Sequence, residues 1–386
     1  MIEKALTGGK GYWTWVVCLL AVIGAGFLTY LYQLQNGLGV TGLTRDVSWG
    51  FYIAQLTYLV GVAASGVMLV LPYYLHNHKA FGKVTILGEF MAVAAIVMCG
   101  LFVFVDLGQP MRVLNVFLYP TPNSILFWDM VVLNVYMLLN LVVGWMVLQA
   151  ENKRSVVPKW VKVLIYISIP WAFSIHTVTA FLYAGLPGRH FWLTAIMAAR
   201  FLASAFCSGP AILLLIMLAL KKIAKFDPGE KAVKGLSIII TYAMLLNVFF
   251  LLLELFTSFY SGIPGHEHTF VYLFAGLDGK HFLTPFMWAV VVLAVFSLVL
   301  LVVPKWRNNI KVLVVALVTL IAATWIEKGL IMVVAGFIPN PLEHVSEYAP
   351  TAPELMISVG IYAIGALVVT ILYKIALGVK KEAATM

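Results

Sequence analysis

The sequence predicts an all-α integral membrane protein with about ten transmembrane helices. Its 386 residues are 62% hydrophobic and only 11% charged, and the mean hydropathy is +0.99. Soluble domains carry about a quarter charged residues, so this composition excludes an ordinary soluble protein. Ten apolar runs are long enough to cross a bilayer core, which takes about 20 helical residues.

The ten apolar runs follow one another with short polar connections, and no soluble domain of any size lies between them. We predict spans at residues 13–34, 48–74, 84–107, 124–148, 160–183, 192–220, 236–260, 285–303, 311–336 and 355–377. The first run follows a short polar start and lacks a small-residue cleavage site, which indicates a retained helix rather than a signal peptide. Residues 1–386 are therefore interpreted as one membrane domain.

The basic residues gather on one side of the predicted membrane. With the N-terminus inside, 19 of the 25 Lys and Arg residues fall in inside segments. The outside loops hold only Arg45, Arg112, Arg189 and Lys280, and Arg200 and Lys328 lie within spans. The positive-inside rule then predicts a multi-pass protein of the cytoplasmic (inner) membrane with both termini in the cytoplasm. The net charge of +9 therefore reflects topology and does not indicate nucleic acid binding.

The cysteines and histidines do not form the patterns of a bound redox centre. Cys18, Cys99 and Cys207 lie singly in three different runs, without a CxxC or iron–sulfur spacing. A bis-histidine haem needs two buried histidines that face each other, and only His176 lies well inside a span. We expect no haem or iron–sulfur cluster in this chain. If the protein handles electrons, the expected carrier is diffusible and lipid-soluble.

Ionisable side chains inside the spans concentrate in the predicted outer half. At about 1.5 Å of rise per residue, the deeper ones lie roughly 8 to 12 Å below the outer surface; they are Asp129, His176, Arg200, Glu254 and Lys328. Asp46 and Asp106 lie at the outer mouth, and Glu89, near the inner end of its span, is the exception. Intramembrane ionisable groups often mark substrate or proton routes. For each residue, a hydrogen bond or ion pair that only joins helices is the alternative.

The stretch TWIEKGLIMVV at 324–334 places Glu327 beside Lys328 inside a span. A charge at such a depth costs about 2.5 to 3.5 kcal/mol even on insertion scales. Neighbours in an α-helix point about 100° apart and do not face one another, so we expect each residue to need a partner on another helix. Arg200 and Glu254 are the candidates, either in structural pairs or in a proton route.

Two outer connections carry similar sequences. Residues 184–194 read AGLPGRHFWLT and residues 275–284 read AGLDGKHFLT. The glycines suit a tight turn, and the exposed cation, His and Phe could face a partner or surround the mouth of a site. A recurring turn without a further role is the alternative.

Several blocks in order resemble one known family. They are DLGQPMR at 106–112, FWD at 127–129, SIHTVTAF at 174–181 followed by LT and CSG, LLLELFTSFY at 251–260, and WIEKG at 325–329 followed by PNP and YAPTAPE. Over nearly its whole length the chain resembles the NrfD/PsrC family, the membrane subunits of polysulfide-reductase-type quinone oxidoreductases. Ten spans rather than eight resemble the longer branch, which includes DsrP, HmcC and QrcD of sulfate-reducer membrane complexes.

The resemblance implies two four-helix bundles, at 48–183 and 192–336, flanked by the helices at 13–34 and 355–377. It implies a menaquinone or other quinone site in the first bundle near the outer face, and no redox metal in this subunit. An extracytoplasmic, ferredoxin-like iron–sulfur subunit would dock on the outer loops, with cytochrome c and catalytic subunits completing a respiratory complex in a lipid membrane.

The resemblance also assigns residues. His176 matches the family's buried histidine, and Asp106 and Asp129 match acidic positions that frame the third outer turn. Asp46 and Trp49 complete the expected quinone-binding set at the outer mouth. Glu254 with Tyr260 matches the motif of the second bundle, where Arg200, Glu327 and Lys328, with Glu89 on the inner side, form a proton route or a structural network.

The predicted chemistry fits these side chains. Quinol oxidation releases two protons and two electrons, so the site needs a base for a hydroxyl and a route for protons. A histidine passes protons near neutral pH, and a carboxylate can orient it, which His176 with Asp106 or Asp129 would supply. Two other functions stay open: a passive anchor for a redox partner, and a secondary transporter, for which Pro170 and Pro210 could mark interrupted helices.

Overall fold

The computed structural model describes residues 1–385 and is helical throughout, with no strand among these residues. Ten helical spans in the described chain are long and apolar enough to cross a membrane. They are Lys10–Val40, Phe51–Leu75, Thr85–Asp106, Ile125–Asn152, Lys159–Ala184, Met197–Ile223, Glu230–Ser261, Thr284–Val302, Ile310–Ala335 and Ala352–Glu382. The predicted all-α fold with ten candidate spans is confirmed.

Most spans are single helices, and two are interrupted. The helices are α1 (Lys10–Asn36), α2 (Phe51–Ala63), α3 (Val67–Leu75), α4 (Thr85–Asp106), α5 (Asn115–Leu118), α6 (Ile125–Asn152), α7 (Lys159–Ala184), α8 (Met197–Ile223), α9 (Glu230–Ser261), α10 (Pro264–Phe274), α11 (Thr284–Val302), α12 (Pro304–Arg307), α13 (Ile310–Ile326), α14 (Met332–Ala335) and α15 (Ala352–Thr385). A 3₁₀ turn, Ala64–Gly66, separates α2 from α3, and a π-helical turn, Glu327–Ile331, separates α13 from α14. Further 3₁₀ turns are Ile2–Leu6, Gly37–Val40, Lys79–Phe81 and Pro110–Arg112.

Two predicted spans begin at other residues than expected. The span predicted at 192–220 begins at Met197. The residues before it form turns, and there Trp192 is held by a hydrogen bond from its Nε1 to the Met332 carbonyl at 2.8 Å. The span predicted at 236–260 begins at Glu230. This polar first turn is helical because Lys234 pairs with Glu230 at 2.6 Å, four residues apart.

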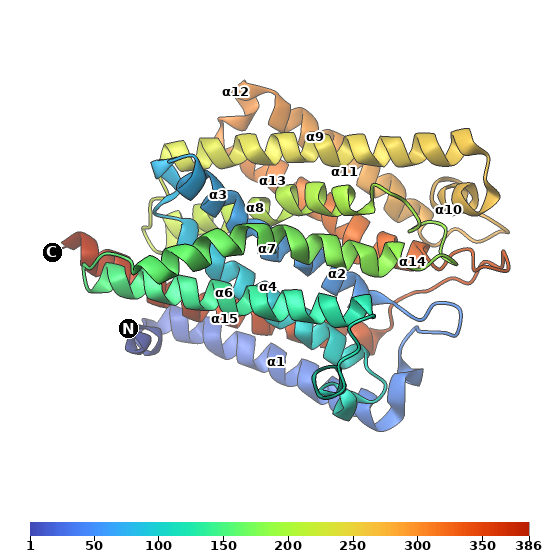
Figure 1. The fold of residues 1–386 in the computed structure, drawn as a ribbon, viewed down its shortest axis with the longest axis horizontal. Helices are drawn as coiled ribbons and strands as arrows, with labels where there is room; N and C mark the ends of the chain where they lie inside the picture. Colours follow the sequence, from blue (N-terminus) through green and yellow to red (C-terminus); the bar gives the residue numbers. More distant parts are fainter. Residues whose placement is uncertain (386) are drawn as a thin grey trace.

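The helices run side by side, so the connections gather at two ends (Figure 1). Both termini lie at one end, here called the terminal side, together with the connections at 76–84, 153–158, 224–229 and 303–309. The opposite end, here called the loop-rich side, holds residues 37–50, 107–124, 185–196, 262–283 and 336–351. The segments of the loop-rich side are the predicted outer connections.

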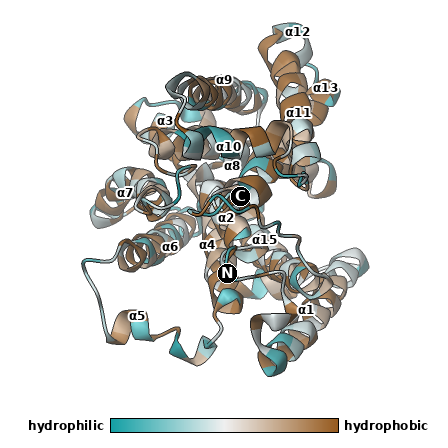
Figure 2. Ribbon diagram, turned by 90° about the vertical axis from the view of Figure 1, so that its right-hand side faces the viewer, coloured by the Kyte–Doolittle hydropathy of each residue, from teal (hydrophilic) through white to brown (hydrophobic). Residues whose placement is uncertain are grey.

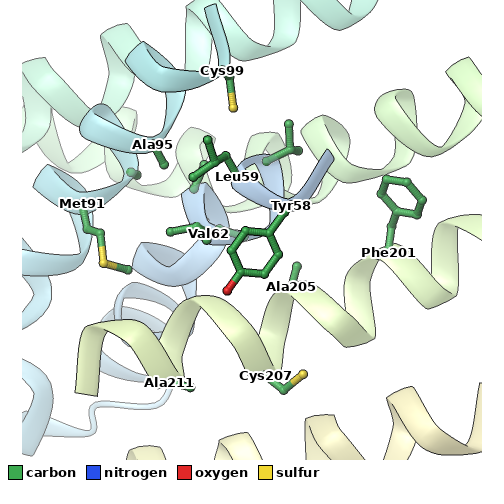
Figure 3. Close-up of a cluster of buried hydrophobic side chains, with 14 of the residues drawn as sticks. Tyr58, Leu59, Val62, Met91, Ala95, Cys99, Phe201, Ala205, Cys207 and Ala211 are labelled. Carbon is green, nitrogen blue, oxygen red and sulfur yellow. The ribbon is translucent and has the colours of Figure 1, made fainter. Parts of the chain in front are cut away.

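Helix α2 forms the centre of the molecule and is buried almost throughout. It packs against α4, α8 and the π-helical turn, and a helix covered on all sides is expected to be apolar all round. Figure 3 shows this core. Tyr58, Leu59 and Val62 of α2 lie between Met91, Ala95 and Cys99 of α4 and Phe201, Ala205, Cys207 and Ala211 of α8.

The other helices surround this centre in two groups. Helices α4, α6 and α7 follow one another on one side of α2, while α8, α9, α11 and α13 form the other group. The groups meet where α8 packs against α2 and α7. The end-on view of Figure 2 shows α15 between α1 and the central helices α2 and α4, with α1 away from α9, α11 and α13.

Helices α1 and α15 pack on each other, and α15 also packs on α4 and α6. A Cβ atom on Gly26 would lie 2.8 Å from the Gly360 Cα atom, so any larger residue at this crossing would separate the backbones. Small residues that allow such close approach are typical of helix pairs in membranes. The first and last spans are therefore joined by backbone proximity.

Candidate functional site

Asp129 of α6 is buried and contacts α7. Its Oδ1 lies 2.5 Å from the Thr179 hydroxyl, which also lies 2.8 Å from the Ile175 carbonyl. A hydroxyl has one proton to donate, so it serves either the carboxylate or the carbonyl. If Asp129 carries a proton, it can donate to Thr179, which then donates to Ile175. This pair can hold a proton without leaving a polar atom unpaired.

His176 lies one turn before Thr179 on the same face of α7, since positions three apart are neighbours on a helix. The side chain is 1% exposed, and neither ring nitrogen has a hydrogen-bond partner in the described chain. Its ring packs against Phe206 of α8, with 6.4 Å between centroids. The predicted hydrogen bond between His176 and Asp106 or Asp129 is not formed. Buried polar atoms almost always have a partner, so two unpaired nitrogens mark a place where a ligand could bind.

Tyr183 continues this face of α7 toward the loop-rich side. Its hydroxyl lies 2.5 Å from the Thr57 hydroxyl of α2. His176, Thr179 and Tyr183 therefore form a polar stripe about 10 Å long, at 1.5 Å of rise per residue.

An aromatic cluster, Trp49, Tyr183, Trp192 and Phe337, covers the end of this stripe. Trp49 meets Tyr183 edge-on at 5.7 Å and stacks on Trp192 at 5.9 Å. Trp192 in turn meets Phe337 at 5.1 Å. The guanidinium of Arg189 lies over Phe337, 4.3 Å from the ring centroid, which is a cation–π contact. Trp49 is thus part of the closure of the polar stripe.

The two aspartates predicted at the mouth differ in their surroundings. Asp106 ends α4, and its Oδ1 is buried without a partner in residues 1–385. Asp46 accepts from the Ser346 hydroxyl at 2.7 Å and from Asn340 at 3.4 Å. The hydrogen bond from Ser346, the largest cause, holds the pKa of Asp46 below its usual range. Asp46 therefore ties two loops together, whereas Asp106 keeps one carboxylate oxygen buried and unpaired.

The segment YAPTAPE at 348–354 fixes the start of α2. The Tyr348 hydroxyl accepts from the Phe51 amide at 2.7 Å and donates to Glu354 at 2.5 Å. The fully buried Glu354 also accepts from the amides of Gly42 and Thr351, at 2.8 and 2.9 Å. In the sequence, Glu354 is an acidic residue directly before an apolar run. In the structure it joins the segment at 348–354 to the loop that holds Gly42.

A second polar cluster lies between α8, α9 and the π-helical turn. Arg200 reaches Glu254 at 3.7 Å and Glu327 at 3.4 Å. Asn247 donates to Glu327 at 3.3 Å, and Thr194 donates to Glu254 at 2.5 Å. With Lys328, which is also buried, two cations face two carboxylates, so the cluster is neutral when all four are ionised.

The expectation that Glu327 and Lys328 do not face one another is wrong. Lys328 Nζ lies 3.8 Å from Glu327 Oε1, and it also reaches Met332 Sδ at 3.3 Å and the Phe201 ring at 4.9 Å. The two residues lie in a π-helical turn, where the α-helical angle of 100° does not apply and functional sites are frequent. Glu327 does find partners on other helices, as expected, in Arg200 and Asn247.

Gln55 of α2, which sequence reasoning missed, joins this turn to the rest of the core. It is fully buried and donates to the Gly329 carbonyl at 2.6 Å. Its carbonyl accepts from Trp325 at 2.8 Å and from Tyr362 of α15 at 2.7 Å. The available signal was an amide inside an apolar run, which has to find partners for its donors and acceptor.

Glu89 and Tyr260 lie outside both clusters. Glu89 is buried on α4 near the terminal side, and its Oε2 has no partner within the described chain. It faces Gly144 of α6, on which a Cβ atom would lie 3.1 Å from Oε2. Tyr260 is 81% exposed and stacks on Phe256 at 5.1 Å. The structure therefore does not bring Tyr260 to Glu254.

The two similar turns are used differently. The first contributes Trp192 to the aromatic cluster and Thr194 to the second polar cluster. In the second, Thr284 donates to the Tyr272 carbonyl at 2.9 Å, and the Phe282 amide donates to Glu347 at 2.6 Å, which holds the turn to the loop at 336–351. His190 of the first turn lies 5.6 Å from His266 between ring centroids, and burial, followed by the charge of His190, lowers the pKa of His266.

Ten apolar helices that enclose unpaired and ion-paired side chains define a multi-pass membrane protein with a polar interior. The described residues contain no group of three His, Cys, Asp or Glu side chains placed to hold a metal ion. The family profile described as "Polysulphide reductase, NrfD" matches residues 39–339. The chain therefore belongs to the NrfD family, as the sequence blocks predicted.

Curated relatives are similar over most of the chain. A provisionally named membrane subunit of a dimethyl sulfoxide reductase from Halobacterium salinarum is 27% identical, over 94% of this chain and 90% of the relative. A selenate reductase subunit from Mesobacillus selenatarsenatis is 26% identical, over 68% of each chain. The Hdr-like menaquinol oxidoreductase integral membrane subunit of Archaeoglobus fulgidus is 25% identical, over 63% of this chain and 60% of the relative.

Proposed function

We propose that this chain is the quinone-reactive membrane subunit of a respiratory oxidoreductase complex, with menaquinone or a related quinone as its diffusible substrate. Membership of the NrfD family and a relative named as a menaquinol oxidoreductase subunit support this proposal. The observation that carries it is a set of unpaired buried atoms: both nitrogens of His176 in the polar stripe, and Oδ1 of Asp106 at the end of α4.

These residues have the donors and acceptors that a quinone head group needs. In the proposal, His176 accepts a hydroxyl proton from a bound quinol, since a neutral imidazole has one acceptor nitrogen. Asp129 and Thr179 hold a proton beside it and pass it toward Tyr183. Asp106 binds the second oxygen, and the aromatic cluster excludes water from the loop-rich side. A bound quinol supplies two electrons and two protons, so a proton acceptor of this kind is required.

We further propose that the loop-rich side faces away from the cytoplasm and receives the electron-transfer partner. Lys and Arg are concentrated in the connections of the terminal side, which the positive-inside rule places in the cytoplasm. A ferredoxin-like iron–sulfur subunit would bind beside the aromatic cluster, and catalytic or cytochrome c subunits would complete the complex. Two relatives are named as single subunits of reductases, which supports an assembly of several different chains.

The second polar cluster is compatible with a structural network and with a proton route. Its balanced charges favour stability of the resting state, whereas its position at a π-helical turn is typical of functional sites. The transporter alternative loses its sequence argument, because α7 and α8 continue through Pro170 and Pro210.

The test is quinol-dependent electron transfer by the purified complex with a His176→Ala chain. We expect loss of activity with normal assembly, since no hydrogen bond of the described chain is removed. Ser174→Ala, on the same helix, is the matched control and should keep activity. A His176 variant that assembles and turns over normally would exclude the proposed site and favour a passive anchor.

A further inference from the structure

A cleft of about 800 Å³ opens on the terminal side between the end of α8 and the starts of α9 and α13. It lies at the opposite ends of α8 and α9 from the second polar cluster, because Arg200 is near the first residue of α8 and Glu254 is near the last turns of α9. Its volume lies within the range of small-molecule sites. Nothing in the proposed quinone chemistry uses it.

The deep part of the cleft is apolar. Its walls include Leu215 and Leu218 of α8, Val233 of α9 and Leu313 of α13. Leu215 lies eight residues before the end of α8, so the cleft extends about 12 Å from the helix ends toward the membrane interior, at 1.5 Å per residue. A wall of this depth can hold the first part of an acyl chain, whereas a soluble anion would leave it unfilled.

The mouth of the cleft carries excess positive charge. Four cations and two carboxylates line it: Lys221, Lys222, Lys234 and Arg307, with Asp227 and Glu230. Lys221 pairs with Asp227 at 2.9 Å and Lys234 pairs with Glu230 at 2.6 Å. Within residues 1–385, Lys222 and Arg307 have no carboxylate partner. Arg307 Nη1 donates to the Leu301 carbonyl at 2.9 Å, and its Nε is buried without an acceptor.

We propose that this cleft binds one phospholipid with a net negative head group from the leaflet at the terminal side. The lipid phosphate lies between Lys222 and Arg307, and an acyl chain lies along the leucines and valine of the wall. The amino ends of α9 and α13 also line the cleft, through Gly229, which precedes α9, and Ile310, the first residue of α13, and helix amino ends attract anions. Basic pockets between spans on the cytoplasmic side are the expected sites for anionic lipids.

The test uses the purified chain with the subunits that accompany it. After detergent exchange, phosphatidylglycerol or phosphatidylcholine is added, and native mass spectrometry counts the lipids retained per chain. We expect one phosphatidylglycerol to be retained more tightly than phosphatidylcholine. Equal retention of the two lipids would overturn the proposal.

Two substitutions address the head group. Lys222 makes no hydrogen bond or ion pair in the described chain, so Lys222→Gln should weaken phosphatidylglycerol binding about fivefold without affecting folding. Adding Arg307→Gln should weaken it about thirtyfold in total, which corresponds to about 2 kcal/mol at 1 kcal/mol for each cation. The control is Lys159→Gln with Lys162→Gln, which removes two exposed cations from α7 on the same side. A control that weakens binding equally would indicate only a diffuse surface charge.

A third substitution distinguishes a lipid from a soluble anion. Ala219 lines the cleft, and the large side chain of Ala219→Trp should occupy the space beside the apolar wall without changing the charge of the cleft. We expect it to abolish the retained phosphatidylglycerol. If retention is unchanged, or if inorganic phosphate alone displaces phosphatidylglycerol from the unaltered protein, the cleft binds an anion and not a lipid. These outcomes do not depend on quinone activity, so the lipid proposal and the quinone proposal can fail separately.

Discussion

Lys328→Met tests whether the second polar cluster is only structural. The change keeps most of the length of the side chain and removes its charge, so Arg200 alone faces the carboxylates of Glu254 and Glu327. At an effective dielectric constant of about 20, unit charges 3.8 Å apart attract by about 4 kcal/mol. Breaking a buried pair costs about 3 to 5 kcal/mol, and we expect the lower end here.

The expected cost is low because Glu327 keeps Arg200 at 3.4 Å and Asn247 at 3.3 Å. A second change, Glu254→Gln, restores charge balance, and the new amide oxygen can still accept from Thr194. If the cluster is only structural, the double variant should recover most of the lost stability and all of the activity. Thermal unfolding in detergent measures the stability, and a double variant no more stable than Lys328→Met would refute the charge-balance reasoning.

Proton conduction predicts another result for the same double variant. If Glu254 and Lys328 carry protons, the protein should be stable and oxidise quinol but lose proton uptake from the cytoplasmic side. Liposomes that contain the complex and a pH-sensitive dye measure this uptake. Normal proton coupling in a stable double variant would exclude the conducting role. The control is Glu343→Gln, which removes the carboxylate of an exposed residue and should leave proton uptake unchanged.

Other substitutions and treatments test the remaining contacts. Gln55→Leu leaves the Gly329 carbonyl unpaired and should lower stability by about 1 to 3 kcal/mol in thermal unfolding. A tag at the C-terminus should resist protease in intact cells, and cleavage without lysis would reverse the proposed orientation. The pKa of Asp46 is lowered in the folded protein. The stabilisation by ionised Asp46 is therefore complete above the ordinary aspartate pKa near 3.9 and is lost as the pH falls through the pKa of the folded state. Limited proteolysis of the loop that Ser346 ties to Asp46 should increase below about pH 4, and Asp46→Asn should abolish that increase. Glu89→Gln should leave quinol oxidation unchanged and, if Glu89 belongs to a proton route, reduce proton uptake measured in liposomes.

The sequence predicted the position of a residue along its helix better than the direction of its side chain around the helix. The position of a residue along a span follows from 1.5 Å of rise per residue, which was enough to select Arg200, Glu254, Glu327 and Lys328 as one cluster. The direction of a side chain around the helix depends on its neighbours. Tyr260 lies six residues after Glu254, which turns it about 240° away on a helix of 3.6 residues per turn, and it is exposed.

Two other features, the π-helical turn and the unpaired nitrogens of His176, could not be predicted from sequence patterns. The π-helical turn at 327–331 brings neighbouring charges together, and no apolar period indicates one extra residue in a turn. The unpaired state of His176 depends on which side chains of α6 and α8 fill the space around it. Packing between helices that are distant in sequence decides both, so they required the three-dimensional structure.

The close crossing of Gly26 and Gly360 has a consequence for biogenesis. Helix α1 ends at Asn36 and its principal partner, α15, begins at Ala352, so more than 300 residues are made between them. At roughly 5 to 20 residues per second, the ribosome takes some tens of seconds to supply the partner. During that time α1 waits in the bilayer, which its apolar sequence permits. Helix α1 can pack on α15 only after residues 352–385 have been made and inserted, so this helix pair forms late in the synthesis of residues 1–385.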